Sequence, residues 1–128
     1  MDALTPEHHT FLRSGKNFGV VATVGDDGRP QTSVVWVDSD GEHVRFNTTN
    51  KRAKGRNLRR DPRVSITVWD RDDPYRYLEV EGIAELTEEG AGEHIDELSR
   101  RYEDKPFHTL TDRVIATIKP TRILDYGR

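Results

Sequence analysis

The sequence predicts a mainly β protein, a six-stranded antiparallel β-barrel with short flanking helices. Three observations support this fold class. Apolar and polar residues alternate in several short runs, as they do in strands with one buried face. The turn sequences GDDG and DSDG follow the first two of these runs. Helical patterns are few and short, and at 128 residues the chain has the size of a single domain, which we expect to span residues 1–128.

The N-terminal half is predicted to contain one short helix and three strands. Thr5 is a good cap residue for the helix, Pro6 suits its first turn, and Gly15 ends it. FGVVATV reads as the first strand and TSVVWVD as the second, and HVRFNT alternates in the same way. The three strands are therefore expected at residues 18–24, 32–38 and 43–48.

The C-terminal half is predicted to contain two helices and three strands. The basic segment 51–60 follows the cap residues Thr48, Thr49 and Asn50, and Asp61 before Pro62 must end it, so it reads as a helix between two strands. A second helix is expected from a cap at Thr87 to about Tyr102, because its apolar residues recur at intervals of three and four. The strands are expected at residues 64–69, 78–86 and 114–119, the last interrupted by Pro120.

The composition limits the class of protein. Hydrophobic residues make up 33% and charged residues 34% of the chain, a lean apolar content that favours completion of the core by self-association. There is no cysteine, which fits a reducing compartment. The start, MDALTPEHHT, lacks the pattern of a secretion signal, and no apolar run approaches the roughly 18 residues of a membrane span. We therefore expect a cytoplasmic protein with no membrane partner.

The most informative segment is KRAKGRNLRR at residues 51–60. It holds six positive charges and no negative one in a chain of net charge −3, so the rest of the chain has a net charge of −9. Like charges three or four residues apart on a helix repel one another. An anionic ligand would relieve this repulsion, and a helix start beside Arg and Lys suits phosphate. The alternative is a solvated face whose long side chains cover apolar surface.

Motifs for other chemistry are absent. The sequence has no GxSxG turn, no HExxH or HxxxH pair, no GxGxxG and no P-loop, which argues against hydrolase, metal-dependent and common nucleotide-binding classes. Glu79, Glu81 and Glu85 alternate along one strand face, as in a solvated face rather than a catalytic pair. We predict no metal site, and no catalytic residue can be assigned.

The order and spacing of three segments carry a family resemblance. VVATVGDDGRPQTSVVWV, VRFNTTNKRAKGRNLRRDPRVSITV and YLEVEGIAEL together resemble the split β-barrel flavin-binding superfamily typified by pyridoxamine 5'-phosphate oxidase. The chain looks most similar to the branch of coenzyme F420-dependent oxidoreductases. The resemblance implies a split barrel and a homodimer, with the cofactor in a groove between the two barrels. It also implies hydride transfer between a deazaflavin and a small organic substrate.

The resemblance also implies site residues. Members hold the cofactor phosphate with an Arg and a Lys two residues apart after the third strand, which are Arg52 and Lys54 here. Threonine hydroxyls precede this pair, the second strand runs along the ring, and two tyrosines match aromatic positions near the groove. With neighbours on the basic segment, the predicted cofactor-binding residues are Gln31, Thr32, Ser33, Val34, Thr48, Thr49, Lys51, Arg52, Lys54, Arg56, Asn57, Tyr75 and Tyr77.

The choice of cofactor rests on charge. Pyridoxamine phosphate oxidases proper are longer and end in a substrate-gripping segment that LDYGR does not match. Arg56, Arg59 and Arg60 exceed what the phosphate of FMN needs, whereas coenzyme F420 adds a lactyl carboxylate and an oligoglutamate tail. We therefore expect F420, with FMN as the alternative.

The sequence leaves two other interpretations of the function open. A carrier that binds the same cofactor without turnover has the same residues as an enzyme. A nucleic-acid-binding barrel would also use a basic helix, but the isoelectric point near 5.9 argues against nucleic acid as a partner.

Overall fold

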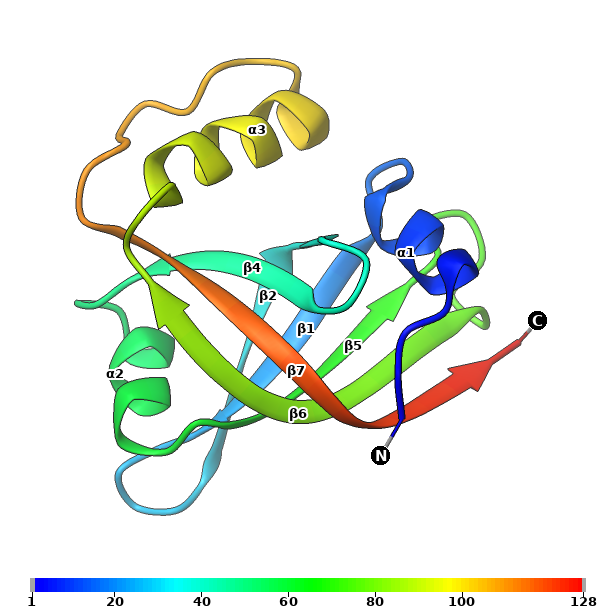
Figure 1. Ribbon diagram of the computed structural model, residues 1–128, viewed down its shortest axis with the longest axis horizontal. Coiled ribbons are helices and arrows are strands. Elements are labelled where there is room, and N and C mark those ends of the chain that lie inside the picture. Colours follow the sequence, from blue (N-terminus) through cyan, green and yellow to red (C-terminus); the bar gives the residue numbers. More distant parts are fainter. Residues whose placement is uncertain (1, 128) are drawn as a thin grey trace.

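The computed structural model of the protein describes residues 2–127 and shows one antiparallel sheet, coiled into a barrel, with three helices around it (Figure 1). The strand order in the sheet is β2-β1-β5-β6-β7-β4-β3. The strands are β1 (Phe18–Val24), β2 (Pro30–Trp36), β3 (Asp38–Ser39), β4 (Val44–Thr49), β5 (Arg63–Trp69), β6 (Tyr77–Thr87) and β7 (Arg113–Tyr126). The helices are α1 (Pro6–Arg13), α2 (Ala53–Arg60) and α3 (Ala91–Glu103). The mainly β class with flanking helices is confirmed.

The predicted count of six strands is wrong, because the second predicted strand divides at Val37. Its first part, β2, pairs with β1, and its second part, β3, pairs with β4. Between them, the Val37 N–H donates to the hydroxyl of Tyr102 (3.1 Å), and the Val37 carbonyl accepts from the Arg101 guanidinium. Side chains from α3 thus satisfy the backbone groups that a continuous strand would have paired.

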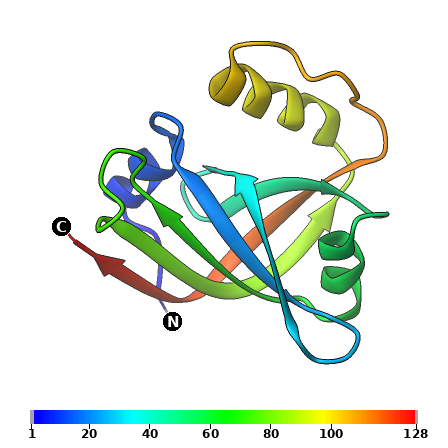
Figure 2. The same cartoon turned by 180° about the vertical axis from the view of Figure 1, so that it is seen from behind.

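The division at Val37 closes the barrel at one corner and leaves a gap between β2 and β4 beyond that corner. Because β2 and β3 are the two edge strands of the sheet and are joined through Val37, the chain itself connects the two edges at that corner. Beyond the corner, within residues 2–127, β2 is paired only on its β1 side and β4 only with β7 and β3. The facing edges of β2 and β4 therefore form a gap in the ladder. Figure 2 shows α3 standing over this end of the barrel.

The core follows from the alternation that the sequence displays. Residues such as Phe46, Ile66, Leu78 and Ile118 point inward and have at most 1% of their surface exposed. Burial of each such side chain stabilises the fold by about 1.5–3 kcal/mol. A second, smaller cluster joins α3 to the outer face of the sheet through Ile95, Leu98 and Tyr102, which pack with Phe18, Trp36 and Phe107. Among the described residues, no helix is long and apolar enough to cross a membrane.

Two helix starts differ from the sequence prediction. Thr87 ends β6, where it pairs with Ile115, and α3 starts only after Gly90, whose φ of +77° suits glycine. The basic helix α2 starts at Ala53, after a turn in which the Thr49 hydroxyl accepts from the Arg52 N–H (3.2 Å). Thr5 does cap α1, by accepting from the His8 N–H.

The last strand is longer than predicted. β7 runs through Pro120 to Tyr126, although Pro120 has no N–H to donate. The partner strand β6 shifts its register between Glu81 and Gly82, directly opposite Pro120, so the missing donor coincides with an irregular step of the ladder. Pairing resumes at Glu81–Arg122 and continues to Tyr77–Tyr126, which brings the end of β7 beside the start of β6.

The connection from β4 to α2 depends on Gly55. A Cβ atom at this position would lie 2.1 Å from the backbone oxygen of Thr49, a distance that no real Cβ contact shows. Gly55 is buried, and the atom it approaches belongs to backbone that cannot turn aside. The glycine therefore lets the basic helix fold back tightly against the end of β4.

We predict that Gly55→Ala destabilises the protein by about 1–3 kcal/mol, because overpacking against backbone outweighs the usual gain from alanine in a helix. Urea denaturation measures the free energy of unfolding. The control is Arg56→Ala, an exposed neighbour in the same helix that should change stability by no more than about 0.5 kcal/mol. A Gly55→Ala protein as stable as the wild type would contradict the tight approach.

Candidate functional site

A pocket of about 210 Å³ lies at the split between β2 and β4. Aromatic and aliphatic side chains from β1, β2, α3 and the loop after α3 form its apolar wall. Asn47 of β4 and three cationic side chains form its polar end. The lining residues are Phe18, Val34, Val35, Trp36, Asn47, Arg52, Lys54, Ile95, Leu98, Phe107 and Arg113.

The polar end of the pocket is strongly positive. Arg52, Lys54 and Arg113 line it, and no carboxylate does. Burial lowers the pKa of Lys54, and the charges of Arg52 and Arg113 lower it further. Burial and the charge of Arg52 likewise lower the pKa of Arg113. Within residues 2–127, none of the three forms an ion pair, so no carboxylate offsets their positive charge.

Sheet pairing brings these cations together from distant parts of the sequence. In the β4–β7 ladder Thr49 pairs with Arg113, and the turn after Thr49 leads at once to Arg52 and Lys54. The N-terminus of α2 opens at the same place, and its first-turn N–H groups add partial positive charge. The Arg113 guanidinium also stacks over the ring of Phe107, 5.1 Å from its centroid.

The apolar wall includes three aromatic rings, those of Phe18, Trp36 and Phe107. Trp36 stacks on Tyr102 with 5.5 Å between the ring centroids and 11° between the ring planes. Phe107 meets the other side of this group edge-on, at 6.3 Å from Trp36. An aromatic wall beside a cluster of cations suits a ligand with a planar apolar ring and an anionic group.

Comparison with known proteins shows the family of this chain. The family described as "Pyridoxamine 5'-phosphate oxidase" matches residues 4–126. The chain belongs to this family. A solved structure titled "F420 Reductase" is similar to it at 39% sequence identity and a TM-score of 0.80, over 94% of this chain and 98% of that one. The conserved hypothetical protein Rv2991 from Mycobacterium tuberculosis is similar at 29% identity and a TM-score of 0.77, over 98% and 87% of the two chains.

More distant structures share the fold alone. HutZ, a heme storage protein from Vibrio cholerae, is 20% identical to this chain with a TM-score of 0.69, over 98% of this chain and 96% of that one. The pyridoxamine 5'-phosphate oxidase fold thus occurs in proteins described as a reductase and as a heme storage protein. The function of this member has to be inferred from its own pocket.

Some of the residues that the sequence nominates for the cofactor lie at the pocket. Arg52, Lys54 and Val34 line it. Thr49 forms the turn that leads into α2, whereas Thr48 points into the barrel, fully buried, and its Oγ1 has no hydrogen-bond partner in residues 2–127. Thr32 and Ser33 lie on β2 next to Val34 and do not line the pocket.

Other nominated residues lie elsewhere. Asn57 is buried on the far side of α2 and donates to Gln31 (2.5 Å) and to Thr23 (3.0 Å). Arg56 donates to the carbonyl of Lys51, and both side chains are exposed. The two tyrosines lie outside the pocket. Tyr75 is 78% exposed, and Tyr77 stacks on Tyr126 with ring centroids 5.0 Å apart.

Two polar residues of the pocket were not nominated from the sequence. Arg113 begins β7 directly before the apolar run of that strand, and Asn47 lies in the middle of β4. Their side chains reach the pocket because β7 pairs with β4, and the Arg113 Nε donates to the Asn47 Oδ1 (2.8 Å). No local pattern in the sequence encodes this pairing.

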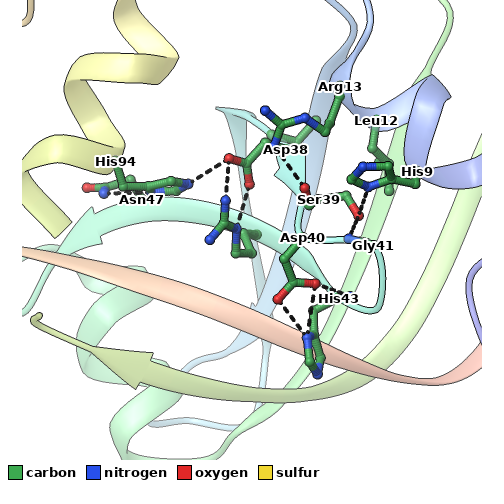
Figure 3. A network of polar contacts seen from close by, with 12 residues as sticks. His9, Leu12, Arg13, Asp38, Ser39, Asp40, Gly41, His43, Asn47 and His94 are labelled. Carbon is green, nitrogen blue, oxygen red and sulfur yellow. Dashed lines mark hydrogen bonds and ion pairs between the residues drawn. The ribbon is translucent and has the colours of Figure 1, made fainter. Parts of the chain in front are cut away.

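A nucleophilic dyad can be set aside. Ser39 Oγ and His9 Nδ1 lie 2.9 Å apart (Figure 3). However, Ser39 has no exposed surface, and its Oγ also accepts from the Gly41 N–H (3.0 Å). A substrate carbonyl therefore has no room to approach this hydroxyl, and the contact ties α1 to β3 instead.

Proposed function

We propose that this protein is an oxidoreductase that uses reduced coenzyme F420 for hydride transfer to a small organic substrate. The single observation that supports it most is the cluster of Arg52, Lys54 and Arg113, three cations that form no ion pair within residues 2–127 and lie at one end of an aromatic pocket. The similarity to a structure titled "F420 Reductase", at 39% identity over nearly the whole chain, supports the same cofactor.

The residues of the pocket fit the chemical parts of such a cofactor. Arg52, Lys54 and Arg113 would hold its phosphate, and the negative charge would restore the pKa of Lys54 toward its ordinary value. The wall of Val34, Trp36 and neighbouring side chains would cover the planar ring and exclude water. The bound deazaflavin supplies the hydride chemistry, and the protein supplies binding and orientation.

A second copy of the chain would complete the site. One copy encloses about 210 Å³, less than the roughly 300–1,000 Å³ of typical cofactor and drug-sized sites. Val34 at the rim is 63% exposed. The outer face of the barrel also presents a row of partly exposed aromatic rings on neighbouring strands, which are Phe18, Trp36, Trp69, Tyr77 and Tyr126. We propose that a homodimer covers this face and supplies the second wall of the groove.

FMN is the second candidate for the same pocket, because its phosphate needs fewer cations. In the sequence, the arginines beyond those needed for a phosphate favoured F420. In the structure, they do not all lie at the pocket. Arg60 donates to Asn57 and to the Val24 carbonyl, away from the pocket, whereas Arg113 adds a third cation inside it. A carrier that binds either cofactor without turnover would use the same residues.

We predict that Arg52→Ala, Lys54→Ala and Arg113→Ala each weaken F420 binding about tenfold or more, because each removes a charge-assisted hydrogen bond worth about 1.5–3 kcal/mol. Fluorescence titration measures the affinity. The matched control is Arg122→Ala, an exposed arginine of β7 outside the pocket, which should bind as the wild type does. Unchanged affinity in all three pocket variants would remove the anion assignment.

We predict that the protein binds F420 more tightly than FMN, and that a longer oligoglutamate tail strengthens binding further. Raising the salt concentration should weaken this additional gain, because exposed charges are screened within about 10 Å at 0.1 M. Titration of both cofactors at two salt concentrations measures these effects. Tighter binding of FMN would make the protein an FMN-dependent member of the family. Reduction of an electrophilic acceptor by the reduced cofactor then separates an enzyme from a carrier.

We predict a homodimer at micromolar concentration that Val34→Glu dissociates, because a charge at the centre of an apolar interface cannot be solvated. Sedimentation velocity measures the oligomeric state. Leu110→Glu serves as the control, since Leu110 is similarly exposed (47%) but lies in the loop after α3. A monomeric wild type with intact cofactor binding would rule out the shared groove.

A further inference from the structure

A chain of buried polar contacts leads from the pocket into the protein behind it. It starts at Arg113 and passes through Asn47 and His94 to Asp38. Figure 3 shows the part of it from Asn47 through His94 to Asp38. Asn47, His94 and Asp38 are 8%, 4% and 4% exposed. Buried polar groups are costly unless every partner is matched, so the direction of each hydrogen bond can be worked out.

The side-chain amide of Asn47 can have only one orientation. Its Nδ2 lies 2.9 Å from the carbonyl of Ala91, which can only accept. Its Oδ1 lies 2.8 Å from Nε of Arg113, which can only donate. These two neighbours on opposite sides fix which atom of the amide is nitrogen and which is oxygen.

The orientation of Asn47 determines the proton positions on His94. Nδ2 of Asn47 also lies 3.0 Å from Nδ1 of His94, and since Nδ2 donates, Nδ1 must accept and carries no proton. The proton of the ring is then on Nε2, which lies 3.1 Å from Oδ2 of Asp38. Nε2–H therefore donates to the carboxylate.

Asp38 is the last residue in this series of polar contacts, and its neighbours keep its carboxylate ionised. Burial raises the pKa of Asp38, but hydrogen bonds from His94 and Arg45 and the charge of Arg45 lower it more, to below its ordinary value. Arg45 holds both carboxylate oxygens, with Nε to Oδ1 and Nη2 to Oδ2 each at 2.9 Å. At neutral pH the carboxylate can only accept, which agrees with the proton position on His94.

We propose that Asp38 and His94 act as positioning residues, which through Asn47 hold the guanidinium of Arg113 toward the anion in the pocket. The inference rests on the proposed function, in which this pocket binds the cofactor phosphate. Asn47 presents its oxygen to Arg113 because His94 accepts from its nitrogen, and His94 accepts there because Asp38 takes its only proton. With Nε occupied by Asn47, the two terminal nitrogens of Arg113 have no hydrogen bond within residues 2–127. They are available to a ligand.

The first test measures the proton positions in the wild-type protein without a ligand. ¹⁵N NMR of the histidine side chains at neutral pH should show His94 with a proton on Nε2 and a bare, hydrogen-bonded Nδ1. The Arg113 Nε–H signal should be protected from exchange with solvent. A proton on Nδ1 of His94, or a freely exchanging Arg113 Nε–H, overturns the proposal. This measurement needs no variant to fold.

The second test is a double-mutant cycle on F420 affinity. His94 does not line the pocket, so His94→Phe should weaken binding only through Arg113, by about fivefold. In an Arg113→Ala background, His94→Phe should have no further effect. A role of His94 in stability alone would leave affinity unchanged in the wild-type background, and an equal loss in both backgrounds would mean that His94 acts without Arg113. Either result refutes this relay, that is, the series of contacts from Asp38 through His94 and Asn47 to Arg113.

The two tests separate this inference from the proposed function. If the wild type binds neither F420 nor FMN, the proposed function fails, and the NMR measurement alone still decides the proton positions. If the wild type binds and Arg113→Ala weakens binding, but His94→Phe does not, the function stands and the relay is wrong. Rescue of affinity by His94→Asn, which restores an acceptor near Nδ1, would support the relay further.

Discussion

The interruption at Val37 is the constraint on which the architecture depends. A strand that continued through this residue would stay beside β1 and could not reach β4. The barrel closes because the backbone groups of Val37 find partners on α3 in place of a strand, namely the Tyr102 hydroxyl and the Arg101 guanidinium. The interruption also leaves β2 and β4 unpaired where they face each other. The pocket lies in the opening that results.

The same arrangement separates the apolar and the charged parts of the pocket. α3 has to lie across the split to deliver Tyr102, and it brings Ile95 and Leu98 with it as an apolar wall. The opposite end of the split is where β4 turns into α2 and where β7 begins. Cations from both segments gather there without carboxylates. These cations repel one another in the folded protein. An anionic ligand that bound among them would relieve the repulsion and stabilise the fold.

Local patterns in the sequence were enough to predict most elements of the fold. The alternation of FGVVATV gave β1 with its exact bounds, and the unbroken run of positive charge from Lys51 pointed to the helix beside the pocket. The division at Val37 could not be seen, because its cause, Tyr102, is 65 residues away in the sequence. A proline in β7 suggested an interruption, but a shift in the register of β6 accommodates it.

The candidate site likewise contains residues that a local pattern predicts and residues that only the fold brings together. Arg52 and Lys54 were predicted because they belong to one short segment with a family resemblance. Arg113 and Asn47 were not, because only the pairing of β7 with β4 makes them neighbours. Asn57 was nominated as a neighbour on that segment and Gln31 as a residue of the strand expected along the cofactor ring, yet they bond to each other behind the helix. Proximity along the chain predicts the cations of α2 and says nothing about which face of the helix a neighbour occupies.

The length of β7 has a consequence for biosynthesis. This strand is 14 residues long, begins with Arg113 and pairs with both β4 and β6, so it joins the two halves of the sheet. Until β7 has left the ribosome, the edges of β4 and β6 that it covers in the finished sheet are unpaired. Arg113, the third cation of the pocket, has not yet joined Arg52 and Lys54. The edges of β4 and β6 that β7 covers have to be protected from other chains until β7 pairs with them.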